Sequence, residues 1–295
     1  MKSNDLDLSG VFTALVTPFS KDGTQIDFES FGSLIEMQLA AGVQGVVVCG
    51  STGEAATLTD QEYVETVRFA RDRTNDKVPC VAGISVSATA RAVEMARVVT
   101  ELGCDGILVA TPPYNKPSQQ GIQAHFRAVK GSTPLPLIGY NIPGRSGVAI
   151  SPSTLGSLSR EGIIAGIKES SGSIDALADT MLTVSPSCHV VSGDDSLTLA
   201  VLAYGGVGVI SASANVMPAE FVSLCGAWAK RDTQKATTIQ REMLPRIRAL
   251  FVESNPVPAK TVLALRGVIA ESTTRLPLVS LSASSLDLVR QEFGV

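Results

Sequence analysis

One lysine of the 295-residue chain stands where a reactive amine could arise. Lys168 directly follows the apolar run from Gly162 to Ile167, so we expect its side chain to be surrounded by apolar groups. Such burial disfavours the charged ammonium form, and a neutral amine can attack a carbonyl carbon to form a Schiff base. The alternative is a structural lysine in an ion pair with Glu169 or a nearby aspartate.

Hydroxyl groups and one guanidinium follow other apolar runs. Tyr140 and Ser51 could transfer protons while an imine forms and is hydrolysed. The glycine-flanked turn that contains Ser51 and Thr52 could offer backbone N–H groups to a carboxylate, and Arg145 could bind a second carboxylate with two hydrogen bonds. The alternatives are an interior aromatic whose hydroxyl bonds to backbone, for Tyr140, and a surface ion pair, for Arg145.

Eight short apolar runs could bring these side chains together. The runs are continuous rather than alternating, which is typical of parallel strands buried on both faces; they cover residues 10–19, 44–50, 78–85, 106–113, 135–143, 162–170, 189–195 and 206–212. Helical segments lie between them, at 28–41, 59–72 (with Thr59 as N-cap), 88–102, 118–130, 173–184 and 195–204. This order predicts an α/β fold, a (β/α)8 TIM barrel with its active site at the carboxyl ends of the strands.

An open doubly wound sheet is the second choice for the fold, because no GxGxxG motif follows the first run. After Ala212 the pattern becomes helical, at 217–230, 232–252, 256–270 and 281–292. One of these helices completes the barrel. We therefore expect a barrel over residues 1–230 that carries the active site, and a C-terminal all-helical extension over 231–295.

Composition and charge exclude several classes of function. The formal net charge is −4 and no basic stripe is present, which argues against nucleic-acid binding. Two histidines, His125 and His189, are too few for most metal sites, and we expect neither a metal nor another cofactor. No apolar stretch is long enough to span a membrane, and the first ten residues lack the apolar segment of a secretion signal. Five scattered cysteines without a CxxC pair suit a reducing cytoplasm.

The loop after the seventh run limits the substrate. Asp194 and Asp195 lie there, where barrels for phosphorylated substrates usually bind phosphate. Two carboxylates would repel a phosphate group. Together with Lys168 and Arg145, this favours a small carboxylic keto acid and an aldehyde over a sugar phosphate.

Four motifs at these strand ends form an ordered set: GSTGE at 50–54, YNIPGR at 140–145, GIKES at 166–170 and SGDD at 192–195. With NPVPAK at 255–260 in the extension, they resemble the dihydrodipicolinate synthase / N-acetylneuraminate lyase family. The resemblance runs from about Gly10 through Leu278, nearly the whole chain.

The resemblance implies a class I aldolase mechanism without a cofactor. Lys168 would form the Schiff base with pyruvate, and Tyr140, Ser51 and Tyr114 would relay protons, with Tyr114 supplied by a neighbouring subunit of a homotetramer built as a dimer of dimers. Four residues would bind the substrates: Thr52, Gly193 and Ile210 for pyruvate, and Arg145 for the carboxylate of the second substrate.

Arg145 also separates the branches of the family, because sialic acid lyases resemble one another in having an apolar or small residue there. The arginine favours the synthase branch, in which pyruvate condenses with L-aspartate 4-semialdehyde to 4-hydroxy-tetrahydrodipicolinate on the route to diaminopimelate and lysine. A lyase that releases pyruvate from a longer 2-keto acid is the second choice. A catalytically inactive barrel that serves as a binding protein is the third, and the joint presence of Lys168, Tyr140 and Tyr114 argues against it.

Lysine-inhibited members of the family resemble one another in an effector site made of a serine, two histidines, an asparagine, a glutamate and a tyrosine. The corresponding positions here are Ala55, Asp60, Tyr63, Ser87, Arg91 and Pro113. Arg91 would oppose the ammonium group of lysine with a like charge. We therefore expect weak or absent inhibition by lysine.

Overall fold

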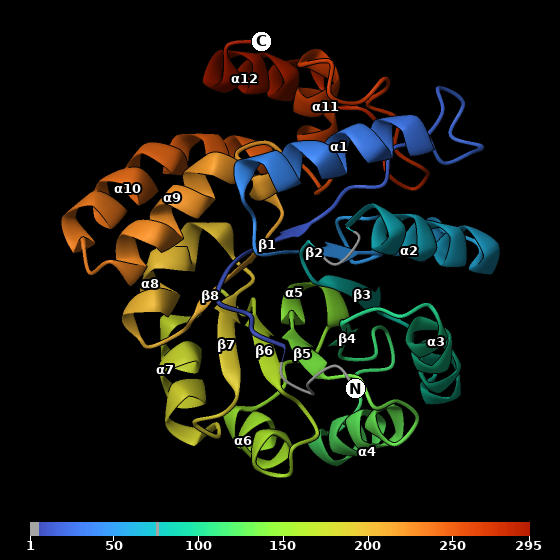
Figure 1. Ribbon diagram of the computed structural model, residues 1–295, viewed down its shortest axis with the longest axis vertical. Coiled ribbons are helices and arrows are strands. Elements are labelled where there is room, and N and C mark those ends of the chain that lie inside the picture. Colours follow the sequence, from blue (N-terminus) through green and yellow to red (C-terminus); the bar gives the residue numbers. More distant parts are fainter. Residues whose placement is uncertain (1–5, 75–76) are drawn as a thin grey trace.

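The computed structural model describes residues 6–74 and 77–295, so the first five residues of the predicted barrel lie outside the described part. Eight parallel strands form a closed barrel in chain order, which confirms the predicted (β/α)8 fold (Figure 1). The strands are β1 (Gly10–Ala14), β2 (Gly45–Val48), β3 (Cys80–Ile84), β4 (Gly106–Ala110), β5 (Leu137–Asn141), β6 (Gly166–Glu169), β7 (His189–Ser192) and β8 (Gly208–Ser211).

Nearly every strand residue is buried, as the continuous apolar runs predict, because one face of each strand fills the barrel and the other packs against helices. The interior contains Phe12, Val47, Leu108, Tyr140 and Ile210, which belong to one buried cluster. All eight strands are shorter than the predicted runs, since several runs continue into loops that contain proline or glycine.

The helices around the barrel are α1 (Phe28–Ala41), α2 (Asp60–Thr74), α3 (Thr89–Glu101), α4 (Gln119–Lys130), α5 (Pro143–Ser146), α6 (Pro152–Arg160), α7 (Ile174–Thr183) and α8 (Thr198–Ala203). Helix α1 has the predicted bounds. Thr59 caps α2 as expected, in a reciprocal pair: its Oγ1 accepts from the Glu62 backbone N–H and Glu62 accepts from the Thr59 N–H.

Three helices around the barrel differ clearly from the prediction, and the first of them, the four-residue α5, was not predicted. Helix α6 was not predicted, because its nine residues contain three serines and few apolar positions; Ser151, which caps it, and Pro152 in its first turn were the available signal. Helix α8 starts at Thr198 rather than at residue 195, because Asp195–Leu197 forms a separate 3-10 turn.

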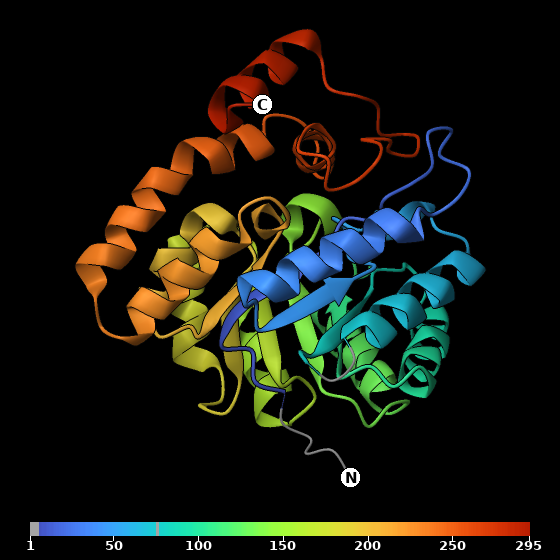
Figure 2. The ribbon, with the colours of Figure 1, turned by 45° about the horizontal axis from the view of Figure 1, so that its top comes forward.

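Four helices follow β8: α9 (Pro218–Ala229), α10 (Thr233–Leu250), α11 (Val257–Leu265) and α12 (Ala283–Phe293). Helix α9 packs on β1, α10 packs on α9, and α12 packs on α10 and α11. Figure 2 shows the segment that contains α11 and α12 lying over one end of the barrel. The division into a barrel and an extension stays a prediction; its boundary at 230/231 lies in the turn between α9 and α10.

All five cysteines are buried and none is in a disulfide, in agreement with the prediction of structural thiols. Burial raises the pKa of Cys188 to about 12, which keeps that thiol protonated and unreactive. Among the described helices, none combines the length and the apolar character needed to span a bilayer.

Candidate active site

A cavity of about 130 Å³ opens at the carboxyl ends of the barrel strands. It brings together six of the eight predicted site residues, namely Ser51, Thr52, Tyr140, Arg145, Lys168 and Gly193. Six further residues line it: Ile142, Ser170, Asp194, Ala212, Phe251 and Asn255. Three of the lining residues carry a formal charge, and two of these charges are positive.

Lys168 lies within β6, between Tyr140 of β5 and Val191 of β7 in the register of the sheet. It is only 5% exposed, and its Nζ lies 4.3 Å from the centroid of the Tyr140 ring. The neighbouring Glu169 is held by others, since its carboxylate accepts from Asn141 Nδ2 (2.9 Å) and from the Ser171 backbone N–H (2.7 Å). No ion pair joins Lys168 to any described residue, so the alternative of a structural ion pair is wrong.

Gly193 follows β7 and packs directly on the side chain of Lys168. A Cβ at this position would overlap Ser170 Oγ and lie 2.7 Å from Lys168 Cγ, so only glycine leaves room for the lysine. The Gly193 backbone N–H donates to the Glu169 carbonyl (2.7 Å). Ile210 of β8 is fully buried in the interior layer that contains Tyr140 and does not line the cavity.

The hydroxyl groups differ in their surroundings. The Tyr140 hydroxyl makes no hydrogen bond to the described residues, so the alternative that backbone satisfies it is wrong. Ser51 is partly exposed at the cavity wall, whereas Thr52 is buried and its Oγ1 accepts a hydrogen bond from Asn255 Nδ2 (2.9 Å). A hydroxyl that accepts from an amide keeps its own hydrogen free to donate elsewhere.

Arg145 lies in the short helix α5, directly after β5. Its Nη2 donates to the backbone carbonyl of Asn255 (3.3 Å), and it forms no ion pair within residues 6–74 and 77–295. The alternative of an arginine used up in a surface salt bridge is therefore wrong. Asn255 thus contacts both Thr52 and Arg145, through its side chain and its main chain respectively. Asn255 was not predicted as a site residue, although the NPVPAK motif, which begins with it, could have indicated it.

Lys260 and Glu54 were not predicted as partners, and their contact joins helix α11 to the GSTGE loop. Lys260 of α11 is fully buried and its Nζ donates to Glu54 Oε1 (2.8 Å), while the Arg275 backbone N–H donates to Glu54 Oε2 (3.0 Å). Burial lowers the pKa of Lys260 to about 8, against the opposing effect of Glu54. Glu54 has a left-handed backbone (φ 52°), so the loop needs such a partner to hold its shape.

Tyr114, like Ile210, is a predicted site residue that the single chain does not bring to the cavity. Its side chain is 91% exposed, and it follows β4 in a loop where its own φ is 71°. A large aromatic side chain held out from the surface in this way is suited to insertion into another molecule.

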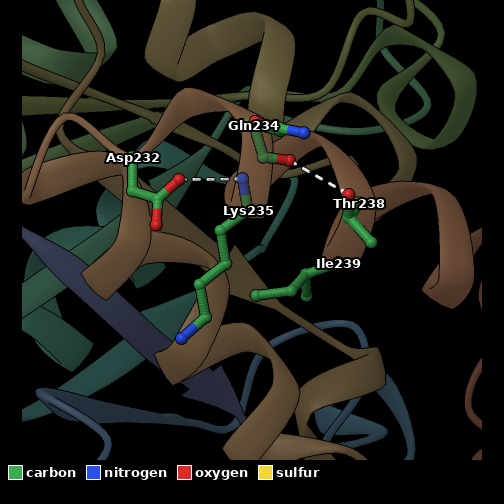
Figure 3. A pocket seen from close by; sticks show the side chains of 5 residues that line it. All are labelled: Asp232, Gln234, Lys235, Thr238 and Ile239. Atoms are coloured by element: carbon green, nitrogen blue, oxygen red, sulfur yellow. Dashed lines mark hydrogen bonds between the residues drawn. The ribbon is translucent and has the colours of Figure 1, made fainter.

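Two other cavities have linings that differ from that of the active-site cavity. One of about 460 Å³ lies at the first turns of α10, where Asp232 accepts from the Lys235 backbone N–H (3.0 Å) and Thr238 donates to the Gln234 carbonyl (Figure 3). These bonds only complete the start of a helix. The other, of about 420 Å³, contains all six positions of the predicted effector site, and there Arg91 is already paired with Asp60 and Glu94.

Comparison with known proteins shows the family of the chain. The model of the dihydrodipicolinate synthetase family matches residues 7–293. The chain belongs to this family. Its members include a 4-hydroxy-tetrahydrodipicolinate synthase of Endomicrobium trichonymphae, which is 39% identical over 97% of this chain and 99% of its own length.

Solved structures of family members agree closely with the fold. The dihydrodipicolinate synthase of Thermotoga maritima has a TM-score of 0.94 at 36% identity, over 97% of each chain. The enzyme of Acinetobacter baumannii, solved in complex with pyruvate, has a TM-score of 0.93 at 33% identity and covers 98% of this chain and 99% of its own. The family resemblance predicted from the motifs is thereby confirmed.

Proposed function

We propose that this protein is a lyase that condenses pyruvate with L-aspartate 4-semialdehyde to 4-hydroxy-tetrahydrodipicolinate. The observation that carries the proposal is that one cavity contains both a buried lysine, Lys168, and a guanidinium, that of Arg145, and that neither has an ion-pair partner among the described residues. The names of the relatives support the same reaction. The activity belongs to lysine and diaminopimelate biosynthesis.

Lys168 is the nucleophile of the proposed reaction. Its amine attacks the C2 carbonyl of pyruvate, and loss of water leaves an iminium. Removal of a proton from C3 gives an enamine, and C3 then forms a bond to the aldehyde carbon while the aldehyde oxygen gains a proton. The amine of the second substrate finally displaces Lys168 from C2, which closes the ring and frees the lysine. Tyr140, Ser51 and Tyr114 relay the protons.

The carboxylates of the two substrates need separate partners. Thr52 donates its free hydrogen to the pyruvate carboxylate, and Gly193 shapes the pocket for the keto acid, with Ile210 in the buried cluster that also contains Tyr140. Arg145 binds the carboxylate of the aldehyde with two hydrogen bonds, which a pocket for an uncharged sugar chain would not need. This use of Arg145 favours the synthase over a lyase for longer keto acids.

Assembly completes the proposed site. The exposed Tyr114 enters the active site of a neighbouring subunit, in a homotetramer arranged as a dimer of dimers. The proposed location is the cytoplasm, which suits five free buried thiols.

Two measurements test this function. Borohydride reduction in the presence of pyruvate should fix a pyruvate adduct on Lys168, detected by mass spectrometry, and the absence of an adduct would overturn the mechanism. Turnover with pyruvate and L-aspartate 4-semialdehyde should exceed cleavage of N-acetylneuraminate and of keto-deoxy sugar acids. Arg145→Ala should impair the synthase reaction selectively; undiminished turnover would remove the basis for the second substrate.

We further propose that lysine inhibits this enzyme weakly or not at all. The cavity that contains the predicted effector positions is lined by the cationic side chain of Arg91. Tyr63, which also lines it, donates its hydroxyl hydrogen to the Gly83 carbonyl (3.0 Å). An arriving ammonium group would have to compete with Arg91 for Asp60. Initial rates measured against increasing lysine should stay nearly constant, and full inhibition at low-millimolar lysine would contradict the proposal.

A further inference from the structure

The charged side chains of the active-site cavity come from three neighbouring strands. Arg145 follows β5, Lys168 lies in β6 and Asp194 follows β7, and these strands are adjacent in the barrel. Arg145 and Asp194 therefore flank the lysine from opposite sides, one as a cation and one as an anion. The proposed mechanism assigns roles to Arg145 and Lys168 but none to Asp194.

Asp194 has a fixed main chain and a free carboxylate. Its backbone N–H donates to Ser192 Oγ (3.3 Å), and Ser192 Oγ donates to its carbonyl (2.7 Å). In the part of the chain that the structure describes, nothing donates a hydrogen bond to its carboxylate and no cation pairs with it. The contrast with the next residue is sharp: Asp195 is fully buried and accepts from the Ser213 backbone N–H (2.7 Å).

The local environment keeps this carboxylate available to a ligand. Burial raises the pKa of Asp194 above its usual value, and the nearby charge of Lys168 offsets only part of this rise. Asp194 Oδ2 would lie 3.8 Å from a Cβ added at Gly172, so glycine leaves one side of the carboxylate open. A half-buried acceptor beside a substrate cavity gains more from a cationic partner than a fully solvated one does.

We propose that Asp194 accepts the ammonium group of the amino-aldehyde substrate. The inference rests on the proposed function, in which the second substrate carries a carboxylate, an ammonium and an aldehyde. Arg145 receives the carboxylate and Asp194 the ammonium, so the substrate lies across Lys168 with its amine on the β7 side. Without Asp194, the ammonium would enter a cavity whose one remaining charged side chain is the cation Arg145, because Lys168 is then the neutral enamine of pyruvate.

Such a contact makes Asp194 a specificity residue for amino-aldehydes. A bond between two charged groups in a partly buried site is strong, and its loss lowers kcat/KM for a substrate that uses it by about 10- to 100-fold. The des-amino analogue 4-oxobutanoate has the same carboxylate and aldehyde but no ammonium, so it should lose almost nothing. Because it has no amine to displace Lys168, water hydrolyses the iminium of its condensation product and frees the lysine.

The experiment compares the two aldehydes in Asp194→Asn with pyruvate saturating. We expect kcat/KM for L-aspartate 4-semialdehyde to fall by about 10- to 100-fold, and that for 4-oxobutanoate condensation by less than about threefold. Asp194→Glu should restore part of the preference. Asp175→Asn, which removes an exposed charge from α7, is the matched control and should leave both values unchanged.

Failure of this inference can be told from failure of the proposed function. If pyruvate forms no adduct on Lys168 in the wild-type protein, the proposed function is wrong. If the adduct forms in both proteins but Asp194→Asn lowers kcat/KM equally for both aldehydes, or for neither, Asp194 does not bind the ammonium. If Asp194→Asn forms no adduct, the two aldehydes are compared in Asp194→Glu instead.

Discussion

The molecule buries two lysines beside aromatic rings, and only one of them has a carboxylate partner among the described residues. Lys168 lies in the barrel with its Nζ 4.3 Å from the centroid of the Tyr140 ring, and Lys260 lies in helix α11 of the C-terminal extension with its Nζ 4.2 Å from the centroid of Phe19. Lys260 is fully buried and bonded to Glu54 (2.8 Å). Lys168 has no such carboxylate among the described residues and faces a cavity.

This difference shows that burial alone does not make a lysine reactive. A buried carboxylate partner stabilises the ammonium and fills its hydrogen-bonding capacity, which makes Lys260 a structural link between α11 and the GSTGE loop. Lys168 keeps its amine available to a ligand because the nearest acid in sequence, Glu169, is bonded to Asn141 and to the Ser171 backbone. The two residues should therefore separate activity from stability when they are replaced.

Replacement of Lys168 should give the largest effect, and on activity alone. Lys168→Met removes the nucleophile, so turnover should fall at least about a thousandfold. No ion pair is broken, so the free energy of unfolding should change by less than about 1 kcal/mol. Steady-state rates and urea denaturation measure the two quantities. A strongly destabilised Lys168→Met would mean that this lysine, too, is structural.

Replacement of Lys260 should mainly lower the stability of the fold. Lys260→Met leaves Glu54 buried without its cation, which should lower the free energy of unfolding by about 3–5 kcal/mol. The double variant Lys260→Met/Glu54→Gln removes both charges and should regain much of that loss. Urea denaturation of the three proteins tests this, and a Lys260→Met variant as stable as the wild type would remove the contrast between the lysines.

A smaller effect should come from Asn255, which joins the extension to the site. Its side chain bonds to Thr52, whereas its main-chain carbonyl accepts from Arg145, so a substitution cuts only the first contact. Asn255→Ala should raise KM for pyruvate by about tenfold, the value of roughly one hydrogen bond, with KM for the aldehyde changed less than about twofold. Equal rises in both KM values would show a general loss of structure instead.

The sequence predicts the barrel and six of the twelve residues that line the cavity, because both depend on local signals. Eight continuous apolar runs indicate parallel strands, and strands in a barrel place their terminal residues, such as Lys168 and Gly193, around one opening. It did not reach Lys260 and Glu54, which are 206 residues apart in sequence and meet only because the extension folds back over the barrel. A contact between segments this far apart produces no periodic pattern of residues in either segment, so the sequence alone does not indicate it.

The smallest expected effect concerns an ion pair at the edge of the same network, between Glu62 and Arg275. Arg275 Nη2 lies 2.5 Å from Glu62 Oε1, but both side chains are still partly exposed (15% and 17%), unlike Lys260 and Glu54. The hydrogen bond from Arg275 lowers the pKa of Glu62 to about 2. Because this pKa lies below the value of 4.5 in the unfolded chain, the pair stabilises the fold above pH 4.5 and stops doing so as the pH falls towards 2.

Glu62→Gln should therefore cost about 1 kcal/mol of unfolding free energy at pH 7, a modest value because solvent screens a partly exposed pair. The difference from the wild type should shrink steadily between pH 4.5 and pH 2, since protonation removes the same charge from the wild-type protein. Urea denaturation of both proteins at several pH values measures this difference. A gap that stays constant down to pH 2 would mean that Glu62 acts through packing rather than charge, and that the partly exposed pair resembles neither buried lysine.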